Sequence, residues 1–371
     1  MSGVGGRPIV GSAHTAASIP QHGRAGVVEM AGTALVLVHG RSQQMPASAR
    51  GGRAEEAAFV AKKRQKWLAG LAKGLTLAGL PPIDSTAVYF PYYANRFADA
   101  IAARERRGLP RPDLGWDVED PDVVVPERPA SADELILGMA QMLGFTPDRE
   151  SLPTADPGEE AEIDEAWRAY TEAGLGDDLG NVLRSRLLRS ALQYLARKTG
   201  ASQLVIERFL TDVAYYLDVP QIRKLVLDIV AADVRKAAAA HDRVVVVAHS
   251  LGTVVGYDVF DALRGSIDVP LFVTAGCPLG LPVVQRSLLP DWKGAGKRAG
   301  PKLEGMGVPW LNAFDVRDFV ALVHPLANFY TAALQDERTF NPSDPHAIQD
   351  YLADPDVARP IGRALAGKRP W

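Results

Sequence analysis

The residue best placed for chemistry is Ser250, which follows the most continuous apolar segment of the chain, residues 244–248. A run of valines of this length is typical of a parallel strand buried on both faces. Apolar residues recur at helical spacing after Ser250, so the sequence predicts a strand, a turn and a helix. On such a turn a serine hydroxyl projects from the sheet edge and can act as a nucleophile. The competing interpretation is a serine that only caps the helix.

The neighbours of Ser250 favour the nucleophile over the cap. The turn requires small side chains two residues before and after the serine, where the sequence has Ala248 and Gly252. Gly256 allows the helix to approach the strand closely. The helix N-terminus directs unpaired N–H groups toward charge that develops at the serine. Because adjacent side chains diverge at a sharp turn, we expect His249 to pack or hydrogen bond beneath the site rather than to act as the base.

Strand-like and helix-like segments alternate on both sides of this turn. The expected strands, each a short apolar run, are residues 33–38, 86–90, 243–248, 270–275 and 310–314. The expected helices are about residues 57–77, 206–240 with a break at Pro220, and 251–263. This alternation predicts an α/β fold with a mostly parallel central sheet flanked by helices.

The segment Ala248-His-Ser-Leu-Gly252 resembles the nucleophile turn of bacterial lipases and esterases in the α/β-hydrolase superfamily. The resemblance extends to His39-Gly40 after the first strand, and to the Ala-Gly-Cys-Pro-Leu-Gly segment at residues 275–280. It also includes the stretch of acids and histidine that begins at Trp310, and it covers residues 31–93 and 206 to about 365. It implies an α/β-hydrolase fold and serine chemistry, and it says little about the substrate.

The resemblance implies that a histidine base activates Ser250, in the chain order serine, acid, histidine. Two histidines follow Ser250, His324 and His346. His346 lies in a turn-rich loop before a short helix, which is where the superfamily places its base. We therefore expect His346 to be the base and His324 to be a structural residue.

The orienting acid is expected just after the strand at residues 310–314, where Asp315 and Asp318 are the candidates. The resemblance places the acid at the second aspartate, Asp318. Asp315 lies at the strand end, where it is suited to hydrogen bonding with the turn. Either carboxylate could hold His346 in the tautomer that the reaction needs.

Two backbone N–H groups would complete the site as an oxyanion hole. We expect one from Leu251, directly after the nucleophile, and one from Arg41 in the loop after the first strand, with Ser42 as the alternative. We interpret the Arg41 side chain as a surface group rather than a ligand for a substrate anion. No cofactor or metal is expected, because the single cysteine, Cys277, has no Cys/His cluster around it.

Residues 94–200 interrupt the alternation and are too long for a loop in a compact domain. Between residues 113 and 165 there are 16 acidic residues and two basic ones, with many prolines. We predict a largely helical insertion that forms a cap over Ser250, because it enters at the carboxyl end of a strand, where ligands of open α/β sheets bind. The alternative is a peripheral decoration. An acidic cap would disfavour anionic substrates, and residues 183–195 are expected to pack on the core as a helix.

The composition is that of an ordinary globular protein, with 47% hydrophobic residues, 23% charged residues and a net charge of −3. This charge excludes a global positive field that would recruit nucleic acid, and no apolar run approaches the roughly 20 residues of a membrane helix. Residues 1–30 are rich in small residues without a secretory-type apolar run, so we expect a disordered leader on a cytoplasmic protein. The expected domains are this leader, a core of residues 31–93 and 201–371, and the insertion of residues 94–200.

Together these features predict a serine hydrolase that cleaves a carboxylic ester, or a thioester or amide, through an acyl-enzyme intermediate. Its substrate would be a small-molecule or lipid-like acyl compound. Two other interpretations remain open at this stage: a noncatalytic interaction module with the same fold, and an acyltransferase or peptidase with the same triad. The sequence does not indicate an oligomeric state.

Overall fold

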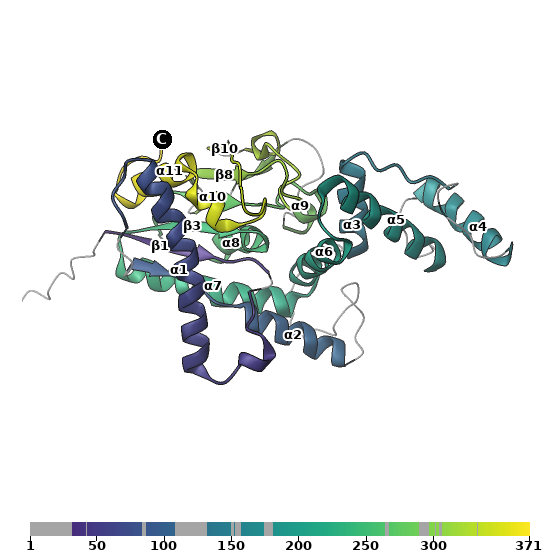
Figure 1. The fold of residues 1–371 in the computed structure, drawn as a ribbon, viewed down its shortest axis with the longest axis horizontal. Helices are drawn as coiled ribbons and strands as arrows, with labels where there is room; N and C mark the ends of the chain where they lie inside the picture. The colour runs from purple at the N-terminus through teal and green to yellow at the C-terminus, as the bar shows by residue number, and fades with distance from the viewer. Residues whose placement is uncertain are drawn as a thin grey trace, which may run out of the picture. The chain divides into compact units, whose positions relative to one another are not determined.

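A parallel sheet forms the centre of the described chain in the computed structural model (Figure 1). The model describes residues 32–41, 43–83, 87–107, 132–149, 152, 157–173, 181–263, 267–288, 297–300, 302–303, 306–331 and 333–371. The strands of this sheet are β1 (Thr33–Val38), β2 (Val88–Tyr89), β3 (Arg243–His249), β4 (Phe272–Ala275), β8 (Trp310–Phe314) and β10 (Leu334–Arg338). Within the described residues, these six strands lie in the order β10-β8-β4-β3-β1-β2, and each neighbouring pair is parallel. The expected α/β architecture with a mostly parallel sheet is confirmed.

The burial of each strand explains why the sequence pattern predicts most of the strands but not β10. All six residues of β1 are buried, and in β3 only Arg243 is partly exposed. A strand that is covered on both faces reads as a continuous apolar run. The sequence of β10, Leu-Gln-Asp-Glu-Arg, has no apolar run, because β10 lies at the sheet edge and is half exposed. β10 was therefore not among the predicted strands.

Helices cover both faces of the sheet. They are α1 (Arg53–Leu77), α2 (Ala94–Arg106), α3 (Ala132–Met142), α4 (Pro157–Ala173), α5 (Asn181–Thr199), α6 (Gln203–Asp218), α7 (Pro220–Ala240), α8 (Leu251–Ala262), α9 (Pro282–Leu288), α10 (Ile348–Ala353) and α11 (Pro355–Leu365). The short elements are η1 (Ala47–Ala49), β5 (Arg298–Ala299), β6 (Lys302–Leu303), β7 (Met306–Gly307), η3 (Leu326–Asn328) and β9 (Tyr330–Thr331). The expected break at Pro220 is confirmed: α6 ends at Asp218, and Pro220 begins α7, where its missing N–H costs no hydrogen bond.

Alternate side chains of each strand belong to different halves of the core. Leu35 and Val245 pack with α1, α10 and α11, whereas Val36 and Val246 pack with α6, α7 and α8. This is the period of two that strand geometry imposes. Figure 1 shows α1, in dark blue, crossing the sheet near the yellow helices α10 and α11.

Residues 94–200 are largely helical where the structure describes them. Helices α3 and α5 pack against α6, and α3 also contacts α9. Ala191 and Leu195 of α5 join the main core, while Leu183 and Leu187 form a small separate cluster with α4. The expected helix over residues 183–195 is thus confirmed. The acidic residues 113–131 and the expected leader of residues 1–30 lie outside the described residues.

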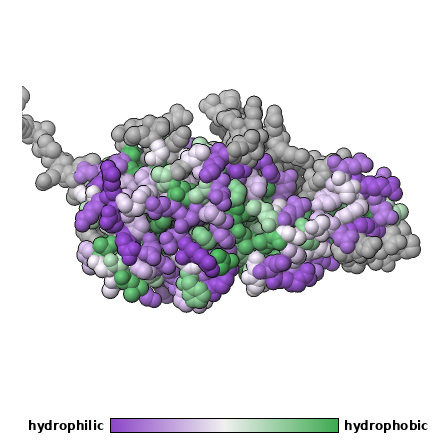
Figure 2. All heavy atoms as spheres, turned by 90° about the horizontal axis from the view of Figure 1, so that it is seen from above, coloured by the Kyte–Doolittle hydropathy of each residue, from purple (hydrophilic) through white to green (hydrophobic). Residues whose placement is uncertain are grey.

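The surface is mixed in character. Figure 2 shows one face, with hydrophilic residues over much of it and hydrophobic residues gathered toward the middle. No helix among the described residues is long and apolar enough to span a membrane.

We predict that Gly74→Ala destabilises the fold although alanine is the better helix former. A Cβ at Gly74 would lie 2.3 Å from the Leu352 carbonyl oxygen, so α1 and α10 would have to separate. Overpacking of this kind costs about 1–3 kcal/mol, and urea unfolding should report it. Gly138→Ala in α3 is the matched control, because its nearest neighbour would be a Val283 methyl at 3.9 Å. Equal stability of the two variants would contradict the tight contact.

Candidate active site

Parallel strands end at the same edge of a sheet, and four of them do so around Ser250. The register pairs Val38 with Ala248, and His249 with Ala275, which in turn pairs with Ala313. The segments that leave β1, β3, β4 and β8 therefore lie beside one another. This common edge brings together residues that are far apart in the sequence.

Ser250 has a backbone conformation that residues other than glycine rarely adopt. Its φ is 58° and its ψ is −134°, and it is the one non-glycine residue with positive φ among the described residues. Such a conformation costs about 1–3 kcal/mol and persists only where the surroundings impose it. Its N–H donates to the Ala275 carbonyl at 3.1 Å. The Oγ is buried, does not cap α8 and makes no hydrogen bond with any described residue. The helix-cap interpretation of Ser250 therefore lacks its hydrogen bond.

Glycines allow the loop after β1 and the helix after β3 to approach each other. A Cβ at Gly40 would lie 2.5 Å from the Ser250 Cβ, and a Cβ at Gly252 would lie 2.4 Å from the His39 carbonyl oxygen. The small residue expected at Gly252 is also required by the end of β1, because a Cβ there would meet the carbonyl oxygens of Val38 and His39. Gly40 is the residue that lies directly against the serine.

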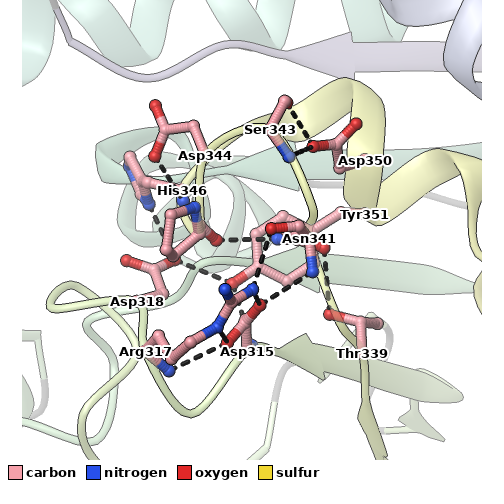
Figure 3. A network of polar contacts seen from close by, with 11 residues as sticks. Asp315, Arg317, Asp318, Thr339, Asn341, Ser343, Asp344, His346, Asp350 and Tyr351 are labelled. Carbon is pink, nitrogen blue, oxygen red and sulfur yellow. Dashed lines mark hydrogen bonds and ion pairs between the residues drawn. The ribbon is translucent and has the colours of Figure 1, made fainter.

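The structure brings His346 and Asp318 together (Figure 3). His346 Nδ1 lies 2.8 Å from Asp318 Oδ2, so Nδ1 carries the proton and donates it to the carboxylate. The buried Asp318 also accepts hydrogen bonds from the Tyr351 hydroxyl at 2.7 Å and the Val320 N–H at 2.9 Å. These bonds fix the carboxylate and leave the Nε2 of His346 as the nitrogen that can accept a proton.

A second histidine supports the loop that carries His346. His249 Nε2 donates to the His346 carbonyl at 2.9 Å, and the two rings lie 4.5 Å apart. Burial lowers the pKa of His249 well below its usual value, so this ring is neutral. Asn341 adds a bond from its Nδ2 to the Pro345 carbonyl at 2.7 Å. His249 thus packs and hydrogen bonds beneath the site, as expected.

The other two candidates have different partners. Asp315 accepts hydrogen bonds from the Arg317 side chain and from the Asn341 N–H. Burial alone would raise the pKa of Asp315, but these bonds outweigh burial and lower it. The Nδ1 of His324 hydrogen bonds to the Ala321 carbonyl at 2.8 Å, and the His324 ring stacks on the Phe314 ring. Asp315 holds a turn and His324 packs locally, whereas Asp318 and His346 are paired.

Ser250, Asp318 and His346 line one cavity of about 560 Å³. This volume is in the range of small-molecule sites. Apolar walls come from Trp67, Phe209, Phe319 and Ile348. From the expected insertion, Thr199 and Gly200 are the described residues that reach this cavity, and the remainder of its lining comes from the core. The cap over the site therefore stays a prediction.

The expected oxyanion donors lie in suitable segments. Leu251 is the first residue of α8, where an N–H has no acceptor within the helix. The N–H of Arg41 follows Gly40, which contacts Ser250. The Arg41 side chain is not a free surface group, because its Nε donates to Asp212 at 2.6 Å. Ser42, the alternative donor, lies outside the described residues.

The ring of His39 fixes the turn that leads to Arg41. Its Nδ1 donates to the Gly40 carbonyl at 2.7 Å, and its Nε2 accepts the Tyr93 N–H at 3.2 Å. The Tyr93 hydroxyl donates to the His39 carbonyl. Burial lowers the pKa of His39 to about 4, so the ring is neutral at pH 7.

Sequence reasoning missed two residues of the site. Tyr351 orients Asp318, but no motif marks it. Gly276 has φ 56°, and a Cβ there would lie 2.8 Å from Asp318 Oδ2. The glycine of the segment at residues 275–280 was a usable signal for this contact. Cys277, next to it, is buried with its pKa raised to about 12, so it is not a reactive thiol.

Comparisons of this chain with protein-family models, curated proteins and solved structures find no match. Among the residues that the structure describes, no group of three or more His, Cys, Asp or Glu side chains is placed to hold a metal ion.

We predict that the fold loses stability as the pH falls from about 6.5 to about 4. Burial lowers the pKa of His39 from 6.5 to about 4, so between these pH values the unfolded chain takes up a proton that the folded state does not, and stability falls as the pH falls. The part due to His39 is about 3 kcal/mol at most, His249 adds a loss of the same sign, and urea unfolding at several pH values measures the sum. His39→Gln should reduce the pH dependence of the free energy of unfolding. An unchanged slope in that variant would contradict the assignment to His39.

Proposed function

We propose that this chain is a serine hydrolase of the α/β-hydrolase type that cleaves a carboxylic ester through an acyl-enzyme intermediate. One observation carries the proposal: a buried serine with a left-handed backbone and no capping bond shares a cavity with a histidine that a buried aspartate holds. A serine needs such a base to become a nucleophile at neutral pH.

Each group has a role in the proposed reaction. Ser250 Oγ attacks the ester carbonyl carbon while His346 Nε2 takes the hydroxyl proton. The N–H groups of Leu251 and Arg41 stabilise the negative oxygen, and His346 then gives its proton to the departing alcohol. Water attacks the acyl-enzyme with His346 again as the base, which releases the acid and restores Ser250. Asp318 stabilises the protonated imidazole throughout.

The resting contact between serine and histidine is incomplete, since Ser250 Oγ makes no hydrogen bond with a described residue. In free enzymes such bonds are often long and close only when substrate binds. The positions of the three groups along the chain support the proposal: the serine follows β3, the acid follows β8 and the histidine follows β10. This is the order serine, acid, histidine of the superfamily that the sequence resembles.

The proposed substrate is a small-molecule or lipid-like acyl compound, which the partly apolar cavity can accommodate. A noncatalytic module of the same fold would have no use for a histidine oriented by a buried carboxylate. An acyltransferase or a peptidase would use the same groups, so product analysis with and without added acceptor alcohols or amines separates these activities from hydrolysis. We also propose that the enzyme hydrolyses its substrate in the cytoplasm.

We predict that a fluorophosphonate probe labels the protein at Ser250 and that Ser250→Ala abolishes the labelling. The probe reacts with a serine only where a base and an oxyanion hole activate it. Mass spectrometry of the labelled peptide identifies the residue, and circular dichroism checks that the variant is folded. Labelling that persists at another serine would overturn the proposal.

We predict that His346→Ala lowers ester turnover by about four orders of magnitude or more, because members of a triad act as a unit. His324→Ala is the matched control: this histidine packs on Phe314, so its loss should reduce stability and leave turnover of the folded fraction within a few-fold. Steady-state kinetics, corrected for the folded fraction by circular dichroism, make the comparison. A larger catalytic loss in His324→Ala would reassign the base.

A further inference from the structure

The cavity that holds Ser250 is lined by an excess of positive side chains. Four cations reach it, namely Arg41, Lys63, Lys66 and Arg317. The carboxylates in its described lining are Asp318 and Asp344, and both bond to His346: Asp318 to the ring and Asp344 to the backbone N–H at 3.0 Å. Within the described residues, neither carboxylate forms an ion pair with one of the four cations.

Two of the four cations are neutralised by other carboxylates. Arg41 bonds to Asp212 at 2.6 Å, and Arg317 bonds to Asp315 at 2.6 Å. Lys63 and Lys66 differ, because within the described part of the chain neither forms an ion pair with an acidic side chain. Lys63 and Lys66 are thus the two cations of the described lining that have no carboxylate partner.

Lys63 is held in place by neutral groups. Its Nζ donates to Gln43 Oε1 at 3.0 Å and lies 5.2 Å from the centre of the Phe59 ring. Gln43 in turn donates from Nε2 to the Arg41 carbonyl at 3.2 Å, so the ammonium is tied to the loop that carries an expected oxyanion donor. Lys63 is only partly exposed.

The surroundings of Lys63 disfavour its own charge. Burial, followed by the nearby Lys66 and Lys62, lowers the pKa of Lys63. Lys66 lies three residues further along α1 and lines the same cavity, so the two ammonium groups face a common space. Lys62 is exposed on the same helix. A negative group in the cavity would relieve the repulsion between these lysines and would satisfy both of them.

We propose that Lys63 and Lys66 bind an anionic group of the substrate, a carboxylate or a phosphate, so that Ser250 acts on negatively charged esters. This inference rests on the proposed function. It runs against the expectation from the sequence that the acidic insertion would disfavour anions, because it depends on the lysines that line the cavity of Ser250. The two lysines that lack a carboxylate partner then decide the preference.

Matched esters test the proposal. On the leaving-group side, 4-acetoxybenzoate and 4-acetoxyphenyl phosphate are compared with neutral 4-acetoxybenzamide, each corrected for its spontaneous hydrolysis. On the acyl side, the 4-nitrophenyl monoester of glutaric acid is compared with its neutral carbamoyl analogue. We expect an anionic ester to exceed its neutral partner about tenfold in kcat/KM, the scale of a hydrogen bond to a charged group. The two carboxylate arms show on which side of the ester the anion binds, and the phosphate arm shows which anion is preferred.

Variants locate the effect. Lys63→Gln and Lys66→Gln should each lower the ratio of anionic to neutral kcat/KM about fivefold, and added salt should lower it in the wild type. Lys73→Gln is the control, because Lys73 is exposed on α1 and does not line the cavity. The inference is overturned if neutral esters react as well as anionic ones in both sets, or if Lys73→Gln lowers the ratio as much as the cavity variants.

The fluorophosphonate probe separates the two levels of the argument. Labelling at Ser250 with no preference for anionic esters removes the inference and leaves the proposed function in place. If Ser250 is not labelled and no ester is turned over, the proposed function fails and the inference fails with it.

Discussion

The contact between the end of β1 and the turn after β3 is the constraint on which the site depends. Gly40 lies against Ser250, and Gly252 lies against the backbone of His39, at distances that leave no room for a Cβ. This packing holds Ser250 at a positive φ that an isolated turn would not adopt. The same contact brings the loop after β1, which carries Arg41, against the turn that carries Ser250 and Leu251. Nucleophile and proposed oxyanion hole are therefore products of a single close approach.

The histidine side of the site is held by a second set of contacts. Asp318 is fixed by Tyr351, which belongs to α10, and α10 packs closely on α1 through Gly70 and Gly74. The loop that carries His346 is bonded from below by His249, a residue of β3. The histidine is therefore held from both a helix and a strand.

The helix α1 has two roles in this arrangement. Gly70 and Gly74 of α1 allow α10 to pack closely, and Tyr351 of α10 then holds Asp318, the partner of His346. Another part of the helix turns Trp67 and two lysines toward the cavity, where Lys63 bonds to the loop after β1. One helix therefore links the support of the proposed catalytic groups to the charge that would select the substrate. Lys63 is partly withdrawn from water, which makes its charge more effective than that of an exposed residue such as Lys66.

Local patterns in the sequence were sufficient for the elements and for the nucleophile turn. Residues 33–38 and 310–314 are strands as predicted, because strands buried on both faces must be apolar, and the small residues around Ser250 follow from a close approach. The edge strand β10 was missed because half-exposed strands carry no such pattern. The resemblance indicated Asp318 and His346, and the structure shows these two in contact.

The tertiary structure alone decided which distant residues meet. Arg41 and Asp212, separated by 171 residues, form an ion pair, and Tyr351 bonds to Asp318 across 33 residues. Neither pairing has a periodic or local signal, because a side-chain contact between separate elements depends on how those elements pack. The balance of charge in the cavity has the same origin. Acidic residues dominate the sequence between 113 and 165, yet two lysines of α1 line the cavity that holds Ser250. The effect of a charge depends on its distance in the fold, not on its position in the chain.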